Sequence, residues 1–175
     1  MKYICLEKTN KDETMIYDNT RVRRQDCLLD EARAREILAS AEYGVLSMVD
    51  LEGKPYGIPV NFVWEDDCAY IHCATEGKKL DILECNEDIS FCVVGKVNLL
   101  PDKFTTEYES LVLTGSATII TSDEERMHAL ELLLEKLSPE HKAIGMQYAK
   151  KSFYRTDIIR LDFTTFSGKC KKVNL

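Results

Sequence analysis

Residues 56–81 read YGIPVNFVWEDDCAYIHCATEGKKLD, which sets two apolar runs before a short basic step. The runs at 58–64 and 68–73 are rich in strand-forming residues, and the acidic turn at 65–67 joins them, so the pattern predicts a β-hairpin. Directly after the hairpin, the step Gly77-Lys78-Lys79 opens a short predicted helix over residues 78–85. The stretch therefore predicts a strand pair followed by two cations at the start of a helix.

The segment before this hairpin extends the β pattern. Asp30 is a favourable N-cap for a helix over 31–41, whose apolar residues fall on one face at helical spacing. Residues 43–49 form the next predicted strand. The turn at 50–53 leads from it to the run that begins at Tyr56, which is a second hairpin signal.

The segment after the hairpin alternates between strands and outer helices. It contains predicted strands at 88–95, 109–121 and 157–163, a loop at 96–106, a helix that runs through Leu137, and a shorter helix at 140–150. Gly115 predicts a bend or bulge in the second of these strands. Ser122 and Glu125 form an S-x-x-E capping box at the start of the first helix, and Pro139 ends that helix.

These elements predict a mainly β fold with peripheral helices. About six strands with turn-length links favour an antiparallel barrel over a doubly wound α/β sheet. The chain has 175 residues and fits a single domain, 1–175, in which residues 1–26 form an N-terminal arm and about 27–170 form the barrel with its helices. The arm contains a basic cluster at 21–24, which could cross to a second subunit, contact a phosphate group of a ligand, or form a solvated strand edge.

Composition and charge exclude several classes of protein. With 45% hydrophobic and 30% charged residues, the chain is typical of a soluble globular protein. A net charge of -7 disfavours nucleic acids and anionic membranes as partners. No apolar run approaches the ~20 residues that cross a bilayer, and residues 1–14 have no signal-peptide core. We therefore expect a cytoplasmic protein.

The seven cysteines form an odd set without a CxxC pair, so we predict no metal site and no redox dithiol. Several of them lie in apolar strands, such as Cys92 in ISFCVVG, where a reduced thiol acts as a small buried hydrophobe. The motifs GxGxxG, GxxxxGK[ST], GxSxG and HExxH are absent from the sequence, which gives no support to a dinucleotide fold, a P-loop, an α/β-hydrolase or a zincin.

The basic step after the hairpin is a candidate phosphate site. A glycine before a helix leaves backbone N–H groups free, and Lys78 and Lys79 add positive charge. The alternative is a pair of solvated surface lysines, which is the more common case for such a short motif.

Two polar residues of the hairpin are further candidates. Asn61, within the run PVNF, can donate to the polar edge of a planar ring, or it can be paired to backbone in an ordinary core strand. His72 shares a strand face with Cys68 and Tyr70 and is a candidate proton donor beside a ligand, or a satisfied strand histidine. His128 and His141 fall in helical segments and are expected to be surface or packing residues.

Several segments together carry a family resemblance. They are YGVLSMVD, GKPYGIPVNFVW, YIHCATEGKKLDIL, ISFCVVG, FTTEYESLVLTGSATII and the late FTTFSGK. In this order, over about residues 43–169, the chain resembles the Nim-type 5-nitroimidazole-resistance proteins within the pyridoxamine 5′-phosphate oxidase-related, FMN-binding split-barrel superfamily. HCATEGKKLD and FTTEYES are the most specific segments.

The resemblance implies a six-stranded split β-barrel that forms a homodimer with FMN at the subunit interface. It implies reduction of a small-molecule electron acceptor, such as a nitroimidazole to its amine, with the redox chemistry supplied by the cofactor. The cofactor-binding residues it implies are Pro59, Val60, Asn61, His72, Ala74, Glu76, Gly77, Lys78 and Lys79, and then Phe104, Thr105, Thr106, Tyr108, Glu109 and Ser110, which approach the site from the same or the partner subunit. His72 is the one candidate catalytic residue.

The chain also departs from parts of the superfamily. The R-x-H element that pyridoxamine phosphate oxidases use is missing from the tail GKCKKVNL, so oxidation of vitamin B6 is not expected. Other superfamily members bind haem, a deazaflavin or FAD in place of FMN. A protein that binds a flavin or haem for storage or sensing, without turnover, therefore remains an alternative to a reductase.

Overall fold

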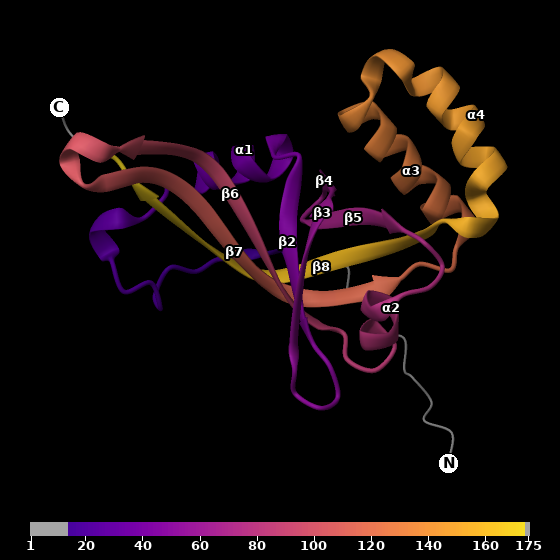
Figure 1. Ribbon diagram of the computed structural model, residues 1–175, viewed down its shortest axis with the longest axis horizontal. Helices are drawn as coiled ribbons and strands as arrows, with labels where there is room; N and C mark the ends of the chain where they lie inside the picture. Colours follow the sequence, from indigo (N-terminus) through magenta and orange to yellow (C-terminus); the bar gives the residue numbers. More distant parts are fainter. Residues whose placement is uncertain (1–13, 174–175) are drawn as a thin grey trace.

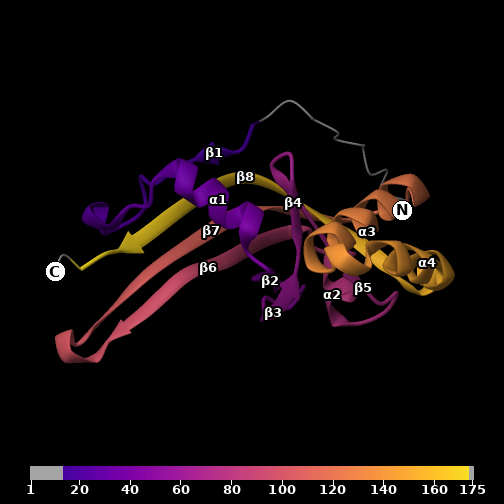
Figure 2. The same cartoon turned by 90° about the horizontal axis from the view of Figure 1, so that it is seen from above.

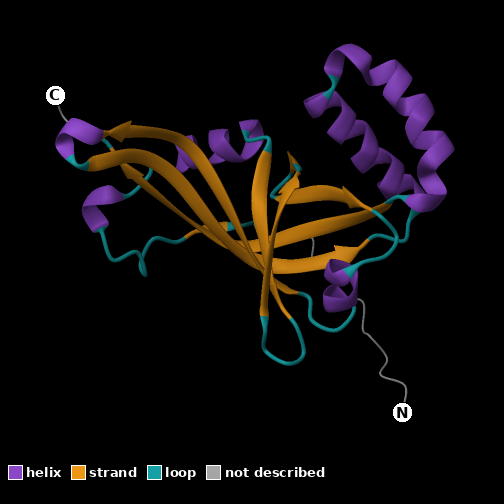
Figure 3. Cartoon of the chain, viewed as in Figure 1, coloured by secondary structure: helices purple, strands orange, loops and turns teal. Residues whose placement is uncertain are grey.

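The computed structural model describes residues 14–173. The helices are α1 (Glu31–Ser40), α2 (Lys78–Leu83), α3 (Asp123–Leu137) and α4 (Lys142–Ser152), and the strands are β1 (Ile16–Tyr17), β2 (Tyr43–Val49), β3 (Pro55–Asn61), β4 (Val63–Glu65), β5 (Cys68–Cys73), β6 (Asp88–Leu100), β7 (Thr105–Ile119) and β8 (Asp157–Lys171). Short 3-10 turns occupy Gln25–Cys27, Pro101–Lys103, Pro139–His141 and Phe153–Arg155. The fold is mainly antiparallel β with peripheral helices, as predicted (Figure 1, Figure 3).

The main sheet is curled and has eight strands, where about six were predicted, and among residues 14–173 its two end strands are not paired with each other. Its strand order is β3-β2-β6-β7-β8-β5-β4, and β1 is added in parallel on β8. The strands at the two ends of this order, β3 and β4, are consecutive in the chain and are joined by Phe62 alone. Phe62 is fully buried and meets Phe91 edge to face, with ring centroids 5.1 Å apart. The inner face of the curled sheet therefore encloses the main apolar core.

The hairpin predicted from residues 58–73 is only partly correct. The run 58–64 divides at Phe62, so that β3 pairs with β2 and only β4 pairs with β5. The predicted turn forms between β4 and β5, and Asp66 and Asp67 have φ values of 45° and 62°. Positive φ at both central residues is the geometry of a tight two-residue hairpin, and aspartate tolerates it better than most residues.

The predicted loop at 96–106 is largely wrong. β6 continues to Leu100 and pairs with β7 beyond an irregularity between Val94 and Val97, and only a short turn separates the two strands. β8 likewise extends past the predicted end at residue 163 to Lys171. These extensions form a long hairpin and a neighbouring strand that project away from α3 and α4 (Figure 1, Figure 2). A register shift occurs at Gly115, as predicted, but its extra residue is Thr164 of β8 and not a residue of β7.

The helices form close to the predicted bounds. Asp30 caps α1 by accepting from Ala32 N and Arg33 N, and Ser122 accepts from Glu125 N at the start of α3. α3 packs on β4, β5 and β8 through a second apolar cluster, and α4 packs on α3. No described helix is both long and apolar enough to cross a membrane.

Residues 1–13 of the predicted N-terminal arm fall outside the described part of the chain. In the rest of the arm, β1 pairs with β8. The Tyr17 hydroxyl donates to Leu29 O, and its ring packs on Phe166. Arg24 of the basic cluster pairs with Asp26 at 2.5 Å. The described part of the arm therefore stays on the β8 side of its own chain.

Candidate functional site

One group of predicted site residues lies along β3, at the end of the sheet order. Side chains of β3 alternate between the two faces, so Val60 packs against the inner core while Pro59 and Asn61 are exposed on the outer face. Asn61 donates its side-chain amide to Glu42 O at 2.9 Å, which is the backbone pairing considered as the alternative from the sequence. Among residues 14–173, β3 pairs with β2 alone, so its other edge has no partner strand there.

A second group is formed where β5 leads into α2. The N-cap of α2 is Gly77, whose φ of 129° is rarely adopted by other residues, and no side chain caps the helix. Lys78 places its ammonium over the Tyr56 ring of β3, 4.7 Å from the centroid. Lys79 is half-buried. The turn thus brings together two cations and uncapped backbone N–H groups, and the Lys78 ammonium lies against β3.

His72 lies next to this turn. It follows Cys68 and Tyr70 on the outer face of β5, as predicted, but its side chain is exposed whereas theirs are buried. Desolvation by the surrounding atoms, and then the charge of Lys79, lower the pKa of His72 from its ordinary 6.5. The neutral imidazole is therefore the main form at pH 7. Ala74 and Glu76, in the link between β5 and α2, are also exposed.

The two other histidines lie away from the turn between β5 and α2. His128 Nε2 is 2.7 Å from Glu65 Oε2 and its ring meets Tyr70 edge to face, while His141 ends a short turn before α4. This agrees with the packing and surface roles expected for them. Among residues 14–173, no three His, Cys, Asp or Glu side chains are grouped so that they could hold a metal ion.

The remaining predicted site residues lie at the far end of the sheet. Phe104, Thr105 and Thr106, and then Tyr108, Glu109 and Ser110, belong to the projecting β6–β7 hairpin. β8 pairs with both regions: Ile158 is opposite His72, and Lys171 is opposite Tyr108. At about 3.3 Å per residue, about 43 Å of strand separates these two points. One subunit therefore keeps His72 far from Tyr108. By contrast, Pro59 of β3 lies in one row with Val45, Cys92 and Val112, and Val112 is two residues from Ser110.

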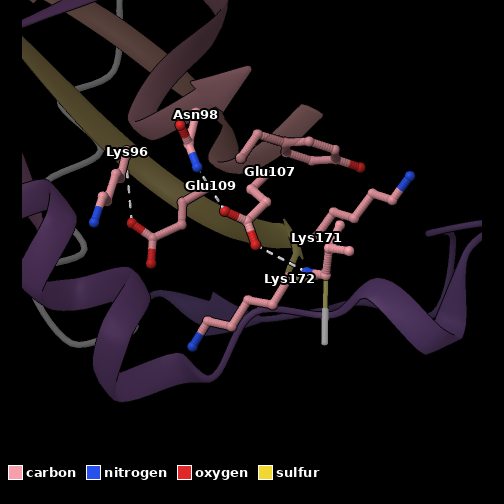
Figure 4. Close-up of a pocket in the computed structure, with 8 residues that line it drawn as sticks. Lys96, Asn98, Glu107, Glu109, Lys171 and Lys172 are labelled. Atoms are coloured by element: carbon pink, nitrogen blue, oxygen red, sulfur yellow. Dashed lines mark hydrogen bonds between the residues drawn. The ribbon is translucent and has the colours of Figure 1, made fainter. Parts of the chain in front are cut away.

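The hairpin end has a cavity of its own, of about 450 Å³ (Figure 4). It is lined by Lys96, Asn98, Glu107, Tyr108, Glu109, Lys171, Lys172 and Val173. Hydrogen bonds from Val173 N and the Asn98 side chain lower the pKa of Glu107. The Arg33 guanidinium lowers the pKa of Glu109 by donating to both carboxylate oxygens, at 3.0 and 2.9 Å.

The outer face of the sheet carries exposed apolar residues. Val45 is opposite Cys92, and Cys92 is opposite Val112, so these three form a row across β2, β6 and β7. The exposed fractions of Val45, Val94 and Val112 are 37%, 52% and 45%. A contiguous apolar patch of this kind on a sheet is typical of an interaction surface.

The residues around β3 and α2 fit a flat phosphorylated cofactor. Lys78 and Lys79 are suited to a phosphate, which lysine binds as a point charge. The open edge of β3 offers backbone groups to a ring with a polar rim. A haem would need an axial ligand, for which His72 is the exposed imidazole near the turn. The donor set therefore fits the anionic group of a cofactor and includes an imidazole that could ligate a haem.

Comparison with known proteins is consistent with this fold. The sequence model of the family described as Pyridoxamine 5′-phosphate oxidase matches residues 30–170. No curated protein matches the sequence. A structure from Bacteroides thetaiotaomicron, described as a 5-nitroimidazole antibiotic resistance protein, aligns over 82% of this chain and 86% of its own with a TM-score of 0.67 and 23% identity.

Two further solved structures have the same fold. An FAD and haem binding protein from Mycobacterium smegmatis aligns over 82% of this chain and 72% of its own, with a TM-score of 0.63 and 20% identity. The haem storage protein HutZ from Vibrio cholerae aligns over 82% of this chain and 91% of its own, with a TM-score of 0.57 and 16% identity. At these identities the likeness establishes the fold alone.

Proposed function

Because the chain belongs to the pyridoxamine 5′-phosphate oxidase family, we propose that it is an FMN-dependent oxidoreductase that reduces a small electrophile such as a 5-nitroimidazole. The observation that carries this proposal is the start of α2, where Lys78 lies over the Tyr56 ring of β3 and the charge of Lys79 acts on His72. The Bacteroides thetaiotaomicron protein, described as a 5-nitroimidazole antibiotic resistance protein, directs the proposal toward nitro compounds.

In this proposal, the lysines hold the phosphate and β3 orients the ring. Lys79 is half-buried, so water screens its attraction to a phosphate less than it would for a fully exposed lysine. Lys78 is held in place by the Tyr56 ring, which lowers the entropy cost of placing its ammonium on an anion. When bound, the flavin supplies electron transfer to the acceptor. The protein supplies position and charge.

His72 is the residue proposed to handle the proton. Its imidazole is exposed beside Lys79, so it can face an acceptor that enters from solvent. Because its pKa is lowered, His72 holds the extra proton only at pH values below about 6.5. Above that pH the neutral ring still donates a hydrogen bond from one nitrogen to a polar group of the acceptor.

We further propose that the site is completed in a homodimer. The hairpin residues Phe104–Ser110 are too far from Lys78 and Lys79 to join them in one subunit, but a second copy docked on the exposed valines brings another hairpin to this region. V112K places a charge in the row Val45–Cys92–Val112 and should therefore prevent dimerisation, so that light scattering gives the mass of a monomer. A variant that remains dimeric would contradict this choice of interface.

An absorption spectrum of the protein purified without added cofactor tests the cofactor, since bands of oxidised flavin support the proposal. Anaerobic mixing of the chemically reduced protein with a 5-nitroimidazole tests the activity. We expect the flavin to be reoxidised. Because a nitro group takes six electrons to become an amine and each reduced flavin supplies two, the amine should form when the reduced protein is in excess over the nitro compound. A flavin that stays reduced in the presence of the nitro compound would contradict the reductase role.

A second candidate function is ligand binding without turnover. It is favoured by the shared fold of HutZ, described as a haem storage protein, and of the protein described as FAD and haem binding, together with the exposed imidazole of His72. A Soret band in the purified protein that is lost on replacing His72 would support this function and overturn the first.

A further inference from the structure

The end of β8 makes a short antiparallel pairing with the segment that precedes α1. Leu28 forms a bridge with Lys169, and Leu29 N donates to Gly168 O at 3.1 Å. In an antiparallel pair, one step forward on one strand corresponds to one step back on the other. The same register therefore places Cys27 opposite Cys170. Residues opposite each other have Cα atoms about 4.5–5.5 Å apart, which lies within the range of about 4.4–6.8 Å found for disulfides.

Both cysteines are free thiols in surroundings that differ. Cys27 is 7% exposed, and its sulfur accepts from Arg24 Nη2 at 3.3 Å. Cys170 is more exposed and donates from its sulfur to Leu28 O at 3.2 Å. The sulfur of Cys170 thus lies against the carbonyl of the residue directly after Cys27.

This opposition is special to these two cysteines. In the register of the described strands, Cys68 is opposite Asp162, Cys73 is opposite Asp157, and Cys92 lies between Val45 and Val112. Cys85 is exposed after α2 and belongs to no described strand. The described part of the chain therefore offers one cross-strand cysteine pair.

We infer that Cys27 and Cys170 are an oxidative modification site, which forms an intramolecular disulfide when the protein meets a small-molecule disulfide. The thiolate of Cys170, the more exposed of the two, attacks one sulfur of the oxidant RSSR and releases one RSH after proton uptake. The thiolate of Cys27 then attacks the Cys170 sulfur of the mixed disulfide and releases the second RSH. The oxidant gains the two electrons that the two protein thiols lose.

The disulfide would tie the N-terminal segment to the end of β8. Lys171 and Lys172, which line the cavity at the hairpin end, directly follow Cys170. Oxidation therefore fixes the wall of this cavity and closes a loop of most of the chain, which restricts the unfolded state. This inference rests on the register of the strands and is independent of the proposed flavin chemistry.

The full chain should be incubated with oxidised glutathione, blocked with iodoacetamide and digested with trypsin without reductant. We expect the peptide 25–33 to be found linked to Cys170-Lys171, and the free thiols of the denatured protein to fall from seven to five. The oxidised protein should melt several degrees above the reduced protein. Both C27S and C170S should lose the linked peptide and the shift in melting temperature, whereas the control C85S should keep them.

Three outcomes would overturn the inference. They are a glutathione adduct on Cys170 without the linked peptide, a bridge that involves any other cysteine, and a bridge between two chains. If C27S does not fold, C170S alone decides, because its more exposed side chain is the safer one to replace.

Discussion

Replacing Lys78 and Lys79 by alanine is the sharpest test of the cofactor site. A charge-assisted hydrogen bond contributes about 1.5–3 kcal/mol when well formed, and an exposed charge contributes less, about 1 kcal/mol or below. Lys79 is half-buried and Lys78 is exposed. We therefore expect K79A to weaken FMN binding by about 10- to 150-fold and K78A by about 5-fold, at about 1.4 kcal/mol for each factor of ten.

Riboflavin separates the phosphate from the rest of the cofactor, because it has the same ring and no phosphate. The affinities of FMN and riboflavin can be measured by quenching of flavin fluorescence at several salt concentrations. The two variants should lose affinity for FMN and keep their affinity for riboflavin. Added salt should weaken FMN binding to the unaltered protein, because screening acts on the charge pair. K150A, at an exposed lysine of α4, is the matched control and should bind both ligands normally.

Two results would refute this reasoning. If FMN affinity is unchanged in K79A, the phosphate does not lie at the start of α2. If FMN and riboflavin lose affinity equally, the lysines act on the shape of the site and not on the phosphate.

Three further predictions concern the fold and the proton donor. G115A should lower the free energy of unfolding in urea by about 3 kcal/mol or more, because a Cβ would lie 1.9 Å from Asp162 O; a variant as stable as the parent would contradict this close approach of β8 to Gly115. R33M should lower the free energy of unfolding in urea by about 1 kcal/mol at pH 7, because it removes the ion pair with Glu109. The difference between R33M and the parent should shrink as the pH falls below about 4.5, because the ionised Glu109, whose pKa is lowered in the fold, stabilises the fold only above that range. H72N should retain flavin but lose the rise in turnover expected below about pH 6.5; an unchanged pH profile would exclude His72 as the proton donor.

Local chemistry explains which parts of the fold were predictable from the sequence. Asp30 and Ser122 cap helices through their own side chains, and Gly115 marks a place where a side chain does not fit. The extension of β6 to Leu100 has no such signal. Its residues are mostly exposed, so no face is buried and no alternation of polar and apolar residues is required. The break at Phe62 was missed because the inner faces of β3 and β4 belong to the same core.

The candidate site divides in the same way. The step Gly77-Lys78-Lys79 and His72 are close in sequence, so their proximity follows from one turn. By contrast, Arg33 and Glu109 are 76 residues apart, and no local pattern indicates that the charge of one is held by the other. From the sequence, the side chain of Asn61 could bind either a ligand or the backbone. In the structure its amide donates to the carbonyl of Glu42.

The projecting hairpin has features that one subunit does not explain. Phe104, at its tip, is 97% exposed and has a φ of 49°, a backbone conformation that costs an ordinary residue about 1 kcal/mol or more. Val97 and Leu99 on the same hairpin are 52% and 70% exposed. A two-fold dimer would bury these residues in both subunits, because each copy offers the same hairpin and the same sheet face to the other. About 43 Å of strand separates FTTEYES from HCATEGKKLD within one chain. In the proposed dimer, FTTEYES of one subunit and HCATEGKKLD of the other would therefore form one site.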